Sequence, residues 1–301
     1  MQVTILGNNS ALPAYGRHPT AQVLSVNGDL LLLDCGEGTQ IQMQRFGLRW
    51  RNLQHIFISH MHGDHYFGLP GLINSMSLLG RTAPLHLFGP EALMPILQQV
   101  LDTANTQLSY PFHFTPLPLG KAAQLTENKN FSVSCFPVYH SVPCHGFVIT
   151  GKTKGRKLLP DACKQYEVPA AFYNKLKQGD DYLRKDGVLV KNDLLTLAAT
   201  PPKKYAYCTD TLYNPNLLPY LANADTLYHE STYLQSDEEK AALRFHSTAQ
   251  QAANMAKQAG VKQLLLGHYS SKYKETAPFA QEAQSIFANT LATTEGETYD
   301  I

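Results

Sequence analysis

The sequence predicts one compact α/β domain with an inserted basic segment, and two patterns lead to this prediction. Short apolar runs typical of buried strands alternate with amphipathic helical segments over the 301 residues. Positive charge is concentrated in residues 151–191, which hold ten Lys or Arg and five acids, whereas the other 260 residues hold 15 bases and 19 acids. Alternating strands and helices build layered folds in which helices cover sheets, so the fold class is α/β.

Strands are expected at 3–6, 22–26, 30–34, 56–59, 131–139, 204–208, 226–228 and 263–266, and helices at 36–46, 91–105 and 247–259. The last helix has the clearest ends. Ser247 or Thr248 can cap its first turn. Gln250 or Gln251 can complete a capping box there, and Gly260 can end the helix.

Residues 151–191 interrupt this pattern. Glycines and prolines divide the segment, its two short helical candidates lie at 160–166 and 170–177, and few of its residues form a core-facing stripe. We therefore expect an excursion from the domain and not a second domain. On charge alone, the segment either binds a polyanion through phosphate contacts or is a solvated Lys-rich loop.

The composition argues against several classes of protein. No run of about 18 apolar residues is present, so no membrane span is expected, and MQVTILGNNS lacks the layout of a signal peptide. A cytoplasmic protein is therefore predicted. The five cysteines are scattered and form no CxxC pair, which argues against a disulfide framework and a thiolate zinc site.

The strongest chemical signal is HMHGDH at 60–65, directly after an expected strand. His60 and His62 alternate on an extended segment, so they point the same way and can share one metal ion. The turn at Gly63 directs Asp64 and His65 towards a second ion. Histidine and aspartate without cysteine favour zinc in a hydrolytic site over structural zinc.

Three further ligand candidates have the same context. His140, Asp210 and His268 each follow an apolar run that is typical of a strand. A single histidine in that position is usually structural, but active-site groups of layered α/β folds gather where strands end. The joint pattern therefore predicts that the three side chains belong to the same metal site.

Together these motifs resemble the ribonuclease Z family, the metallo-β-lactamase-fold endonucleases that trim the 3′ end of precursor tRNA. The matching segments are DCGEGTQ (34–40), FISHMHGDHYFGLPGL (57–72), His140, TDT (209–211), HEST (229–232), HST (246–248) and GHYSSKY (267–273). HxHxDH alone marks only the superfamily, whereas HEST and HST narrow the resemblance to the tRNA-processing branch. The resemblance implies an αββα four-layer sandwich over residues 1–301, with 151–191 as a protruding, flexible arm that binds tRNA.

The resemblance also implies two zinc ions per chain and a water between them as the nucleophile. One ion would be held by His60, His62 and His140, the other by Asp64, His65 and His268, and both by Asp210. The implied reaction removes the 3′ trailer from precursor tRNA. It leaves a 3′-hydroxyl on the tRNA and a 5′-phosphate on the trailer.

Three catalytic roles follow from the resemblance. Asp64 would accept the proton of the water, and His246 would be the general acid that protonates the departing 3′ oxygen. Glu230 would hold His246 and raise its pKa. Without the family, His246 is more simply a histidine that flanks a helix. Lys272 would contact a phosphate, as a point charge and not as a bidentate fork.

The resemblance implies that the arm binds the tRNA. It also implies a homodimer in which the arm of one subunit presents tRNA to the active site of the other. The implied arm contacts are Lys152, Lys154, Arg156, Lys157, Lys175 and Lys177. The chain departs from the family in two places. Ala170 and Ala171 stand in an arm segment that is usually rich in Gly and Pro, and Ser231 stands where alanine is usual.

Two other functions compete with this interpretation. A hydrolase of small phosphodiesters, aryl sulfates or lactones would keep the metal site but would have no use for a basic excursion of this length. An RNA-binding or scaffold protein with a decayed metal site would lack a ligand, whereas all seven positions are filled here.

Overall fold

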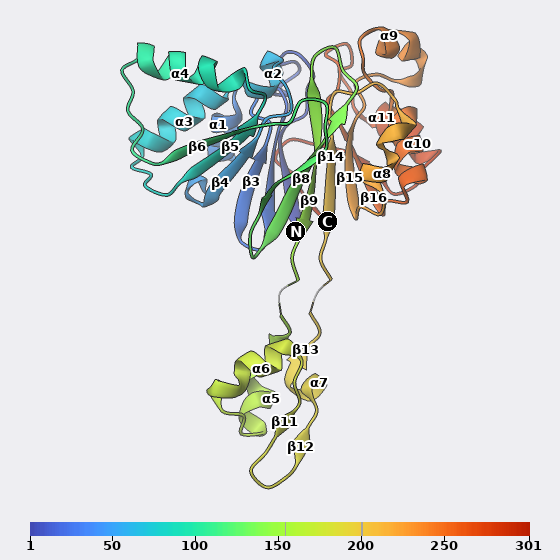
Figure 1. The fold of residues 1–301 in the computed structure, drawn as a ribbon. Helices are drawn as coiled ribbons and strands as arrows, with labels where there is room; N and C mark the ends of the chain where they lie inside the picture. The colour runs from blue at the N-terminus through green and yellow to red at the C-terminus, as the bar shows by residue number, and fades with distance from the viewer. Residues whose placement is uncertain (154, 200) are drawn as a thin grey trace. The chain divides into compact units, whose positions relative to one another are not determined.

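The computed structural model describes residues 1–153, 155–199 and 201–301. The chain folds as two compact units, Met1–Gly151 with Lys203–Ile301, and Lys152–Pro202 (Figure 1). We describe each unit by itself.

Two seven-stranded sheets form the centre of the first unit. The first sheet has the order β18 (Thr298–Asp300), β1 (Gln2–Gly7), β2 (Ala21–Val26), β3 (Asp29–Leu33), β4 (Leu53–Phe57), β5 (Leu85–Gly89) and β6 (Phe112–Pro116). The second has the order β17 (Thr290–Ala292), β16 (Gln263–Gly267), β15 (Thr226–Glu230), β14 (Lys204–Cys208), β9 (Cys144–Gly151), β8 (Phe131–Val138) and β7 (Ala123–Glu127).

Helices cover the outer face of each sheet, which gives four layers (Figure 1). On the first sheet these are α1 (Thr39–Arg45), α3 (Leu69–Leu78) and α4 (Leu93–Thr103), and on the second α8 (Leu218–Leu221), α10 (Ala249–Ala259) and α11 (Ala277–Gln284). Two short helices, α2 (Gly63–Tyr66) and α9 (Glu238–Leu243), lie in loops. One apolar cluster fills the space between the sheets and one lies under each helical layer.

Helix α10 has the ends that the sequence predicts. The Thr248 side chain accepts from the backbone of Gln251, whose side chain accepts from the backbone of Thr248. Gly260 ends the helix at φ 65°, in the left-handed region. The buried face consists mostly of alanine, which lets the helix approach the second sheet closely.

The second unit has a small core of its own, which the sequence pattern did not predict. It contains the pairs β10 (Lys157–Leu158) with β13 (Thr196–Leu197) and β11 (Tyr182–Leu183) with β12 (Leu189–Val190), and the helices α5 (Pro160–Gln165), α6 (Tyr173–Gln178) and α7 (Asn192–Leu195). Its buried apolar residues are Cys163, Val168, Leu176, Tyr182, Val190 and Leu195. They come from several short elements, so no helical stripe shows in the sequence, and the unit extends past residue 191 to Pro202.

The strand directions decide where side chains meet. Strands β3 and β4 are parallel, as are β14, β15 and β16. Strand β8 runs in the same direction as β14, because both are antiparallel to β9. The carboxyl ends of these strands therefore share an edge in each sheet, which is where layered α/β folds place their sites.

Candidate metal centre

Eight His and Asp side chains converge at these strand ends. Seven of them form two groups, and the eighth, His246, forms a third group with Asp210 and His268. The first group is His60, His62, His140 and Asp210, and the second is Asp64, His65 and His268. Within each group the donor atoms all lie within 4.8 Å of one another. These are the seven residues that the sequence singled out as metal ligands.

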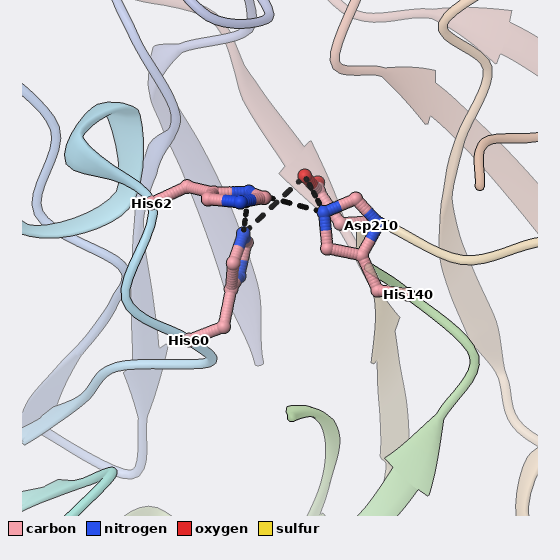
Figure 2. A group of neighbouring side chains, drawn as sticks. All are labelled: His60, His62, His140 and Asp210. Carbon is pink, nitrogen blue, oxygen red and sulfur yellow. Dashed lines mark hydrogen bonds and ion pairs between the residues drawn. The ribbon is translucent and has the colours of Figure 1, made fainter. Parts of the chain in front are cut away.

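In the first group, three imidazoles turn their nitrogens towards one point (Figure 2). His62 Nδ1 lies 3.0 Å from His60 Nε2 and 3.1 Å from His140 Nε2. Asp210 Oδ2 completes the group, 3.5 Å from His60 Nε2 and 3.6 Å from His140 Nε2. Three nitrogens and one oxygen around one point match the donor set of a zinc ion.

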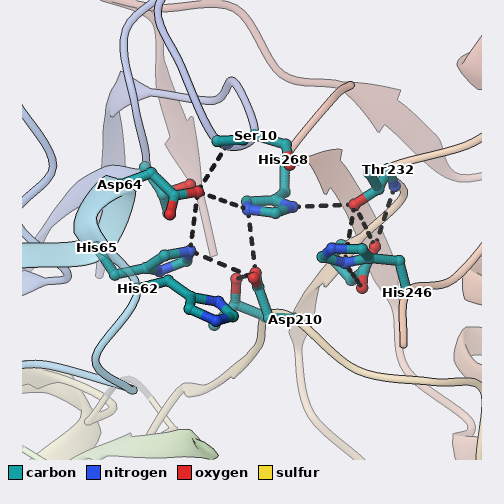
Figure 3. A network of polar contacts seen from close by, with 12 residues as sticks. Ser10, His62, Asp64, His65, Asp210, Thr232, His246 and His268 are labelled. Atoms are coloured by element: carbon teal, nitrogen blue, oxygen red, sulfur yellow. Dashed lines mark hydrogen bonds and ion pairs between the residues drawn. The ribbon is translucent and has the colours of Figure 1, made fainter. Parts of the chain in front are cut away.

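The second group shares Asp210 with the first (Figure 3). Asp210 Oδ1 lies 3.1 Å from His268 Nε2, while its Oδ2 faces the first group and lies 3.4 Å from His65 Nε2. Asp64 Oδ2 lies 3.5 Å from both His65 Nε2 and His268 Nε2. One carboxylate thus offers an oxygen to each group, as a bridging ligand does. Asp210 and His268 adopt positive φ, 38° and 61°, to reach these positions.

The remaining ring nitrogens fix the tautomers of four histidines. The Nδ1–H of His140 donates to the Phe245 carbonyl at 3.1 Å, and that of His268 to Thr232 Oγ1 at 2.9 Å. The Nδ1–H of His60 donates to Ser59 Oγ at 2.9 Å. His65 donates through Nδ1 to Asp34. In each of these four rings, Nε2 then carries a lone pair that is directed into the site. Metal-binding histidines have this arrangement.

Asp34 is a site residue that the sequence analysis missed. The buried carboxylate accepts hydrogen bonds from Ser59 Oγ at 2.9 Å, His65 Nδ1 at 2.8 Å and Tyr207 Oη at 2.7 Å. It orients His65 directly and His60 through Ser59, and so positions one ligand of each group. Asp34 follows β3, so the strand-end position that marks His140 would also have identified it.

The electrostatics of the site fit a bound cation. Burial holds the pKa of His60 well below its usual range, so the ring is neutral, as a ligand must be. Burial also lowers the pKa of His65, but the carboxylates of Asp210, Asp64 and Asp34 outweigh it and raise that pKa well above the usual range. The buried Nε2 atoms of His65 and His268 have no hydrogen-bond partner among the described residues. Metal ions would satisfy both the excess negative charge and the unpartnered nitrogens.

Asp34→Asn should weaken metal binding by about 10- to 100-fold, the usual cost of losing such a supporting group. The carboxylate of Asp34 accepts three hydrogen bonds on Oδ2. The amide of asparagine is neutral and therefore a weaker acceptor, so it would hold these three donors less firmly. Metal affinity measured by competition with a chromophoric chelator tests this. Asp29→Asn is the matched control, because Asp29 lies at the other end of β3 and accepts from Asn130. Unchanged affinity in Asp34→Asn would rule out the positioning role.

His246 and Glu230 form a separate pair beside the clusters. His246 Nδ1 donates to Glu230 Oε1 at 2.8 Å. Burial lowers the pKa of His246, but the Glu230 carboxylate overcomes this and raises it to about 9. Glu230 is fully buried and also accepts from the Thr211 amide and from the amide and hydroxyl of Thr232. Thr232, another residue that the sequence did not single out, thereby links this pair to His268.

The Lys and Arg residues that the sequence suggested as substrate contacts differ in their surroundings. Lys272 Nζ lies 2.6 Å from both carboxylate oxygens of Asp237. Arg156 is engaged within the second unit, by Asp193 and by Thr196 Oγ1. Lys175 lies 5.5 Å from the centre of the Phe172 ring. Lys157 and Lys177 are exposed, Lys152 borders Gly151, and Lys154 lies outside the described residues.

Comparison with known proteins gives three kinds of likeness. Residues 1–167 match the family model described as anti-Pycsar protein Apyc1. Ribonuclease Z from Porphyromonas gingivalis is 41% identical over 299 residues, which cover 99% of this chain and 98% of the relative.

Two solved structures resemble the fold. The short form of human tRNase Z has a TM-score of 0.73 at 24% identity and covers 100% of this chain and 99% of its own. The metallo-β-lactamase fold protein YhfI from Bacillus subtilis has a TM-score of 0.69 at 19% identity, with 99% and 98% covered. Among the described residues, no helix is long and apolar enough to cross a membrane.

Proposed function

The chain belongs to the ribonuclease Z family and, through residues 1–167, to that of the anti-Pycsar protein Apyc1, and we propose that it removes the 3′ trailer from precursor tRNA. The proposal follows the first family because the Apyc1 match ends before Asp210, His246 and His268, whereas the ribonuclease Z relatives span them. The chain has the metallo-β-lactamase fold, as the motifs implied. The observation that carries the proposal is the His246–Glu230 pair beside two His and Asp clusters that share Asp210.

We propose zinc as the metal, because nitrogen and carboxylate donors without thiolate suit zinc in a hydrolytic site. His60, His62 and His140 would hold one ion, Asp64, His65 and His268 the other, and Asp210 both. When bound, the ions would lower the pKa of water and neutralise charge on the phosphoryl oxygens. That chemistry needs imidazoles that present Nε2 to the ions, and the Nδ1 hydrogen bonds of His60, His65, His140 and His268 fix this orientation.

The protein's own groups supply the proton transfers. Asp64 Oδ2 accepts a hydrogen bond from the Ala11 amide at 2.8 Å, while Oδ1 makes no hydrogen bond to the described residues. We therefore assign Oδ1 as the acceptor of the attacking water's proton. His246 holds its Nδ1 proton on Glu230, which directs Nε2 away from that carboxylate. The Nε2 proton would go to the departing 3′ oxygen, leaving a 3′-hydroxyl on the tRNA and a 5′-phosphate on the trailer.

Two zinc ions per chain are expected after exhaustive dialysis of the purified protein. Seven ligands exceed what one tetrahedral ion takes, and Asp210 offers one oxygen to each cluster. Metal analysis by emission spectrometry measures the stoichiometry. Full activity at a stoichiometry near one would contradict the two-metal proposal.

Precursor tRNA and bis-p-nitrophenyl phosphate, each assayed with and without chelator, test the function as a whole. The proposal requires chelator-sensitive cleavage of the precursor at the trailer junction. Hydrolysis of the small diester alone would instead favour a small-substrate hydrolase of the same fold.

We also propose that the second unit, Lys152–Pro202, is the tRNA-binding arm. Its ten Lys or Arg against six acids give it the positive excess that phosphate contacts require, while the rest of the chain is net negative. The homodimer and the cytoplasmic location stay predictions.

A further inference from the structure

A pocket of about 490 Å³ opens beside the metal clusters and has a lining that phosphate binding alone does not explain. Its wall includes three metal-group residues, His62, Asp64 and Asp210, and also His246. The other lining residues are Ser10, Ala11, Leu12, Pro13, Pro19, Glu37, Gly63 and Phe67. We propose that Phe67 and Leu12 form a stacking platform for the first nucleobase of the RNA trailer. This proposal rests on the proposed tRNA-processing function and adds a subsite to it.

The two platform side chains are exposed on backbone that is held in place. Phe67 is 61% exposed, and its amide donates to the Gly63 carbonyl at 2.9 Å. The ring lies across Gly63, where an added Cβ would come within 2.1 Å of it. Single exposed apolar residues are common, but Phe67 and Leu12 both line the pocket that contains the metal-group residues, which is where ligands are recognised.

Leu12 is presented by an equally constrained loop. Its side chain is 52% exposed, while its carbonyl accepts from Asn9 Nδ2 at 2.6 Å. The neighbouring Ala11 amide donates to Asp64 Oδ2 at 2.8 Å, which ties the loop to the second cluster. The apolar surface is therefore positioned relative to the metal ligands and costs little entropy on binding.

Away from His246 and the metal groups, the lining favours a base over a phosphate. None of the described lining residues is Lys or Arg, and Glu37 adds an exposed carboxylate. A second phosphate would be repelled there, whereas a nucleobase carries no charge and stacks on aromatic rings irrespective of sequence. The Glu37 carboxylate can in addition accept a hydrogen bond from a base amino group.

The position of His246 determines which nucleotide faces the platform. Figure 3 shows Asp64 and His246 on opposite sides of His268 and Asp210. His246 protonates the 3′ oxygen of the last tRNA nucleotide, so that nucleotide lies on the His246 side. Phe67 packs on Gly63, the neighbour of Asp64, and is therefore on the other side, where the trailer continues.

The experiment combines Phe67→Ala with removal of single bases from the substrate. Precursor tRNA is prepared unmodified, with an abasic first trailer nucleotide, or with an abasic last tRNA nucleotide, and kcat/KM is measured for each. Phe67→Ala should lower kcat/KM on the unmodified RNA by about tenfold to a hundredfold, the usual worth of one stacked base. The abasic trailer nucleotide should lower the wild-type value similarly, and the two changes together should add little.

Several controls isolate stacking. Phe67→Trp keeps an aromatic face and should retain most of the activity. Leu78→Ala removes an exposed apolar side chain of α3 that is absent from the pocket lining and should change nothing. Zinc content should be equal in all variants, because Phe67 is not a ligand.

The outcomes separate the subsite from the function. An equal loss for Phe67→Ala on unmodified and abasic-trailer RNA would overturn the platform, as would coupling to the last tRNA nucleotide instead. Failure of the wild-type protein to cleave the unmodified RNA would overturn the proposed function and the platform with it.

Discussion

His246→Ala is expected to lower kcat on precursor tRNA by about 10²- to 10⁴-fold, the usual worth of a general acid. The leaving ribose oxygen is strongly basic and needs a proton as its bond to phosphorus breaks. Glu230 raises the pKa of His246 to about 9, so the imidazole carries that proton at neutral pH. The other histidine of the pocket lining, His62, belongs to the first metal group, and burial lowers its pKa, so it does not replace His246 as an acid.

Two measurements make this prediction specific. Zinc content should not change, because His246 Nδ1 is engaged by Glu230 and the seven ligands remain. Hydrolysis of bis-p-nitrophenyl phosphate should fall much less, because nitrophenolate leaves without a proton. His113→Ala, at an exposed histidine of β6, is the matched control and should leave both activities unchanged. Equal losses on the two substrates would show that His246 is not the acid.

The metal-site residues could be selected from the sequence because each follows an apolar run. The direction of the chain changes where a strand ends, and His140, Asp210 and His268 all stand at that point. Asp34 also follows a strand, but its role in orienting two ligands could not be inferred from that position. It depends on the pairing of β3 with β4, which brings Ser59 and His65 to a residue 25 or more positions earlier.

Strands β5 and β6, which carry histidine, were missed. His55, His86 and His113 are neighbours in register on β4, β5 and β6, and their rings stack at 5.2 and 4.9 Å. A polar residue at each of these positions breaks the apolar run that predicts a strand, although the stacked rings pack as aromatic side chains do. The expected strand at 56–59 is displaced for the same reason, since β4 is Leu53–Phe57.

The charge of the arm was visible in the sequence, but its core was not. Val168, Leu176 and Tyr182 come from a loop, a helix and a strand, so their burial has no period. The limits of the unit decide how it can be removed. Gly151 donates its amide to the Lys203 carbonyl at 2.8 Å, so the two ends of the first unit are adjacent without the arm.

Deleting residues 152–202 and joining Gly151 to Lys203 with a short Gly-Ser link should separate recognition from chemistry. The deletion removes ten Lys or Arg, and KM for precursor tRNA should rise on the order of a hundredfold. The log–log salt dependence of binding should become shallower by about 0.9 for each phosphate that the arm no longer neutralises. Hydrolysis of bis-p-nitrophenyl phosphate should persist, because none of the described residues of 152–202 belongs to the three apolar clusters of the first unit or to the metal groups.

A charge-neutralised arm distinguishes phosphate binding from the bulk of the unit. Lys157, Lys164 and Lys177 make no ion pair with the described residues, so changing them to Gln leaves the core of the arm intact. This variant should lose part of the tRNA affinity and part of the salt dependence, because three of the ten cations are removed. A folded, zinc-loaded deletion variant that binds precursor tRNA as tightly as the intact chain would contradict the arm assignment. The most economical function would then be hydrolysis of a small substrate at the same metal centre.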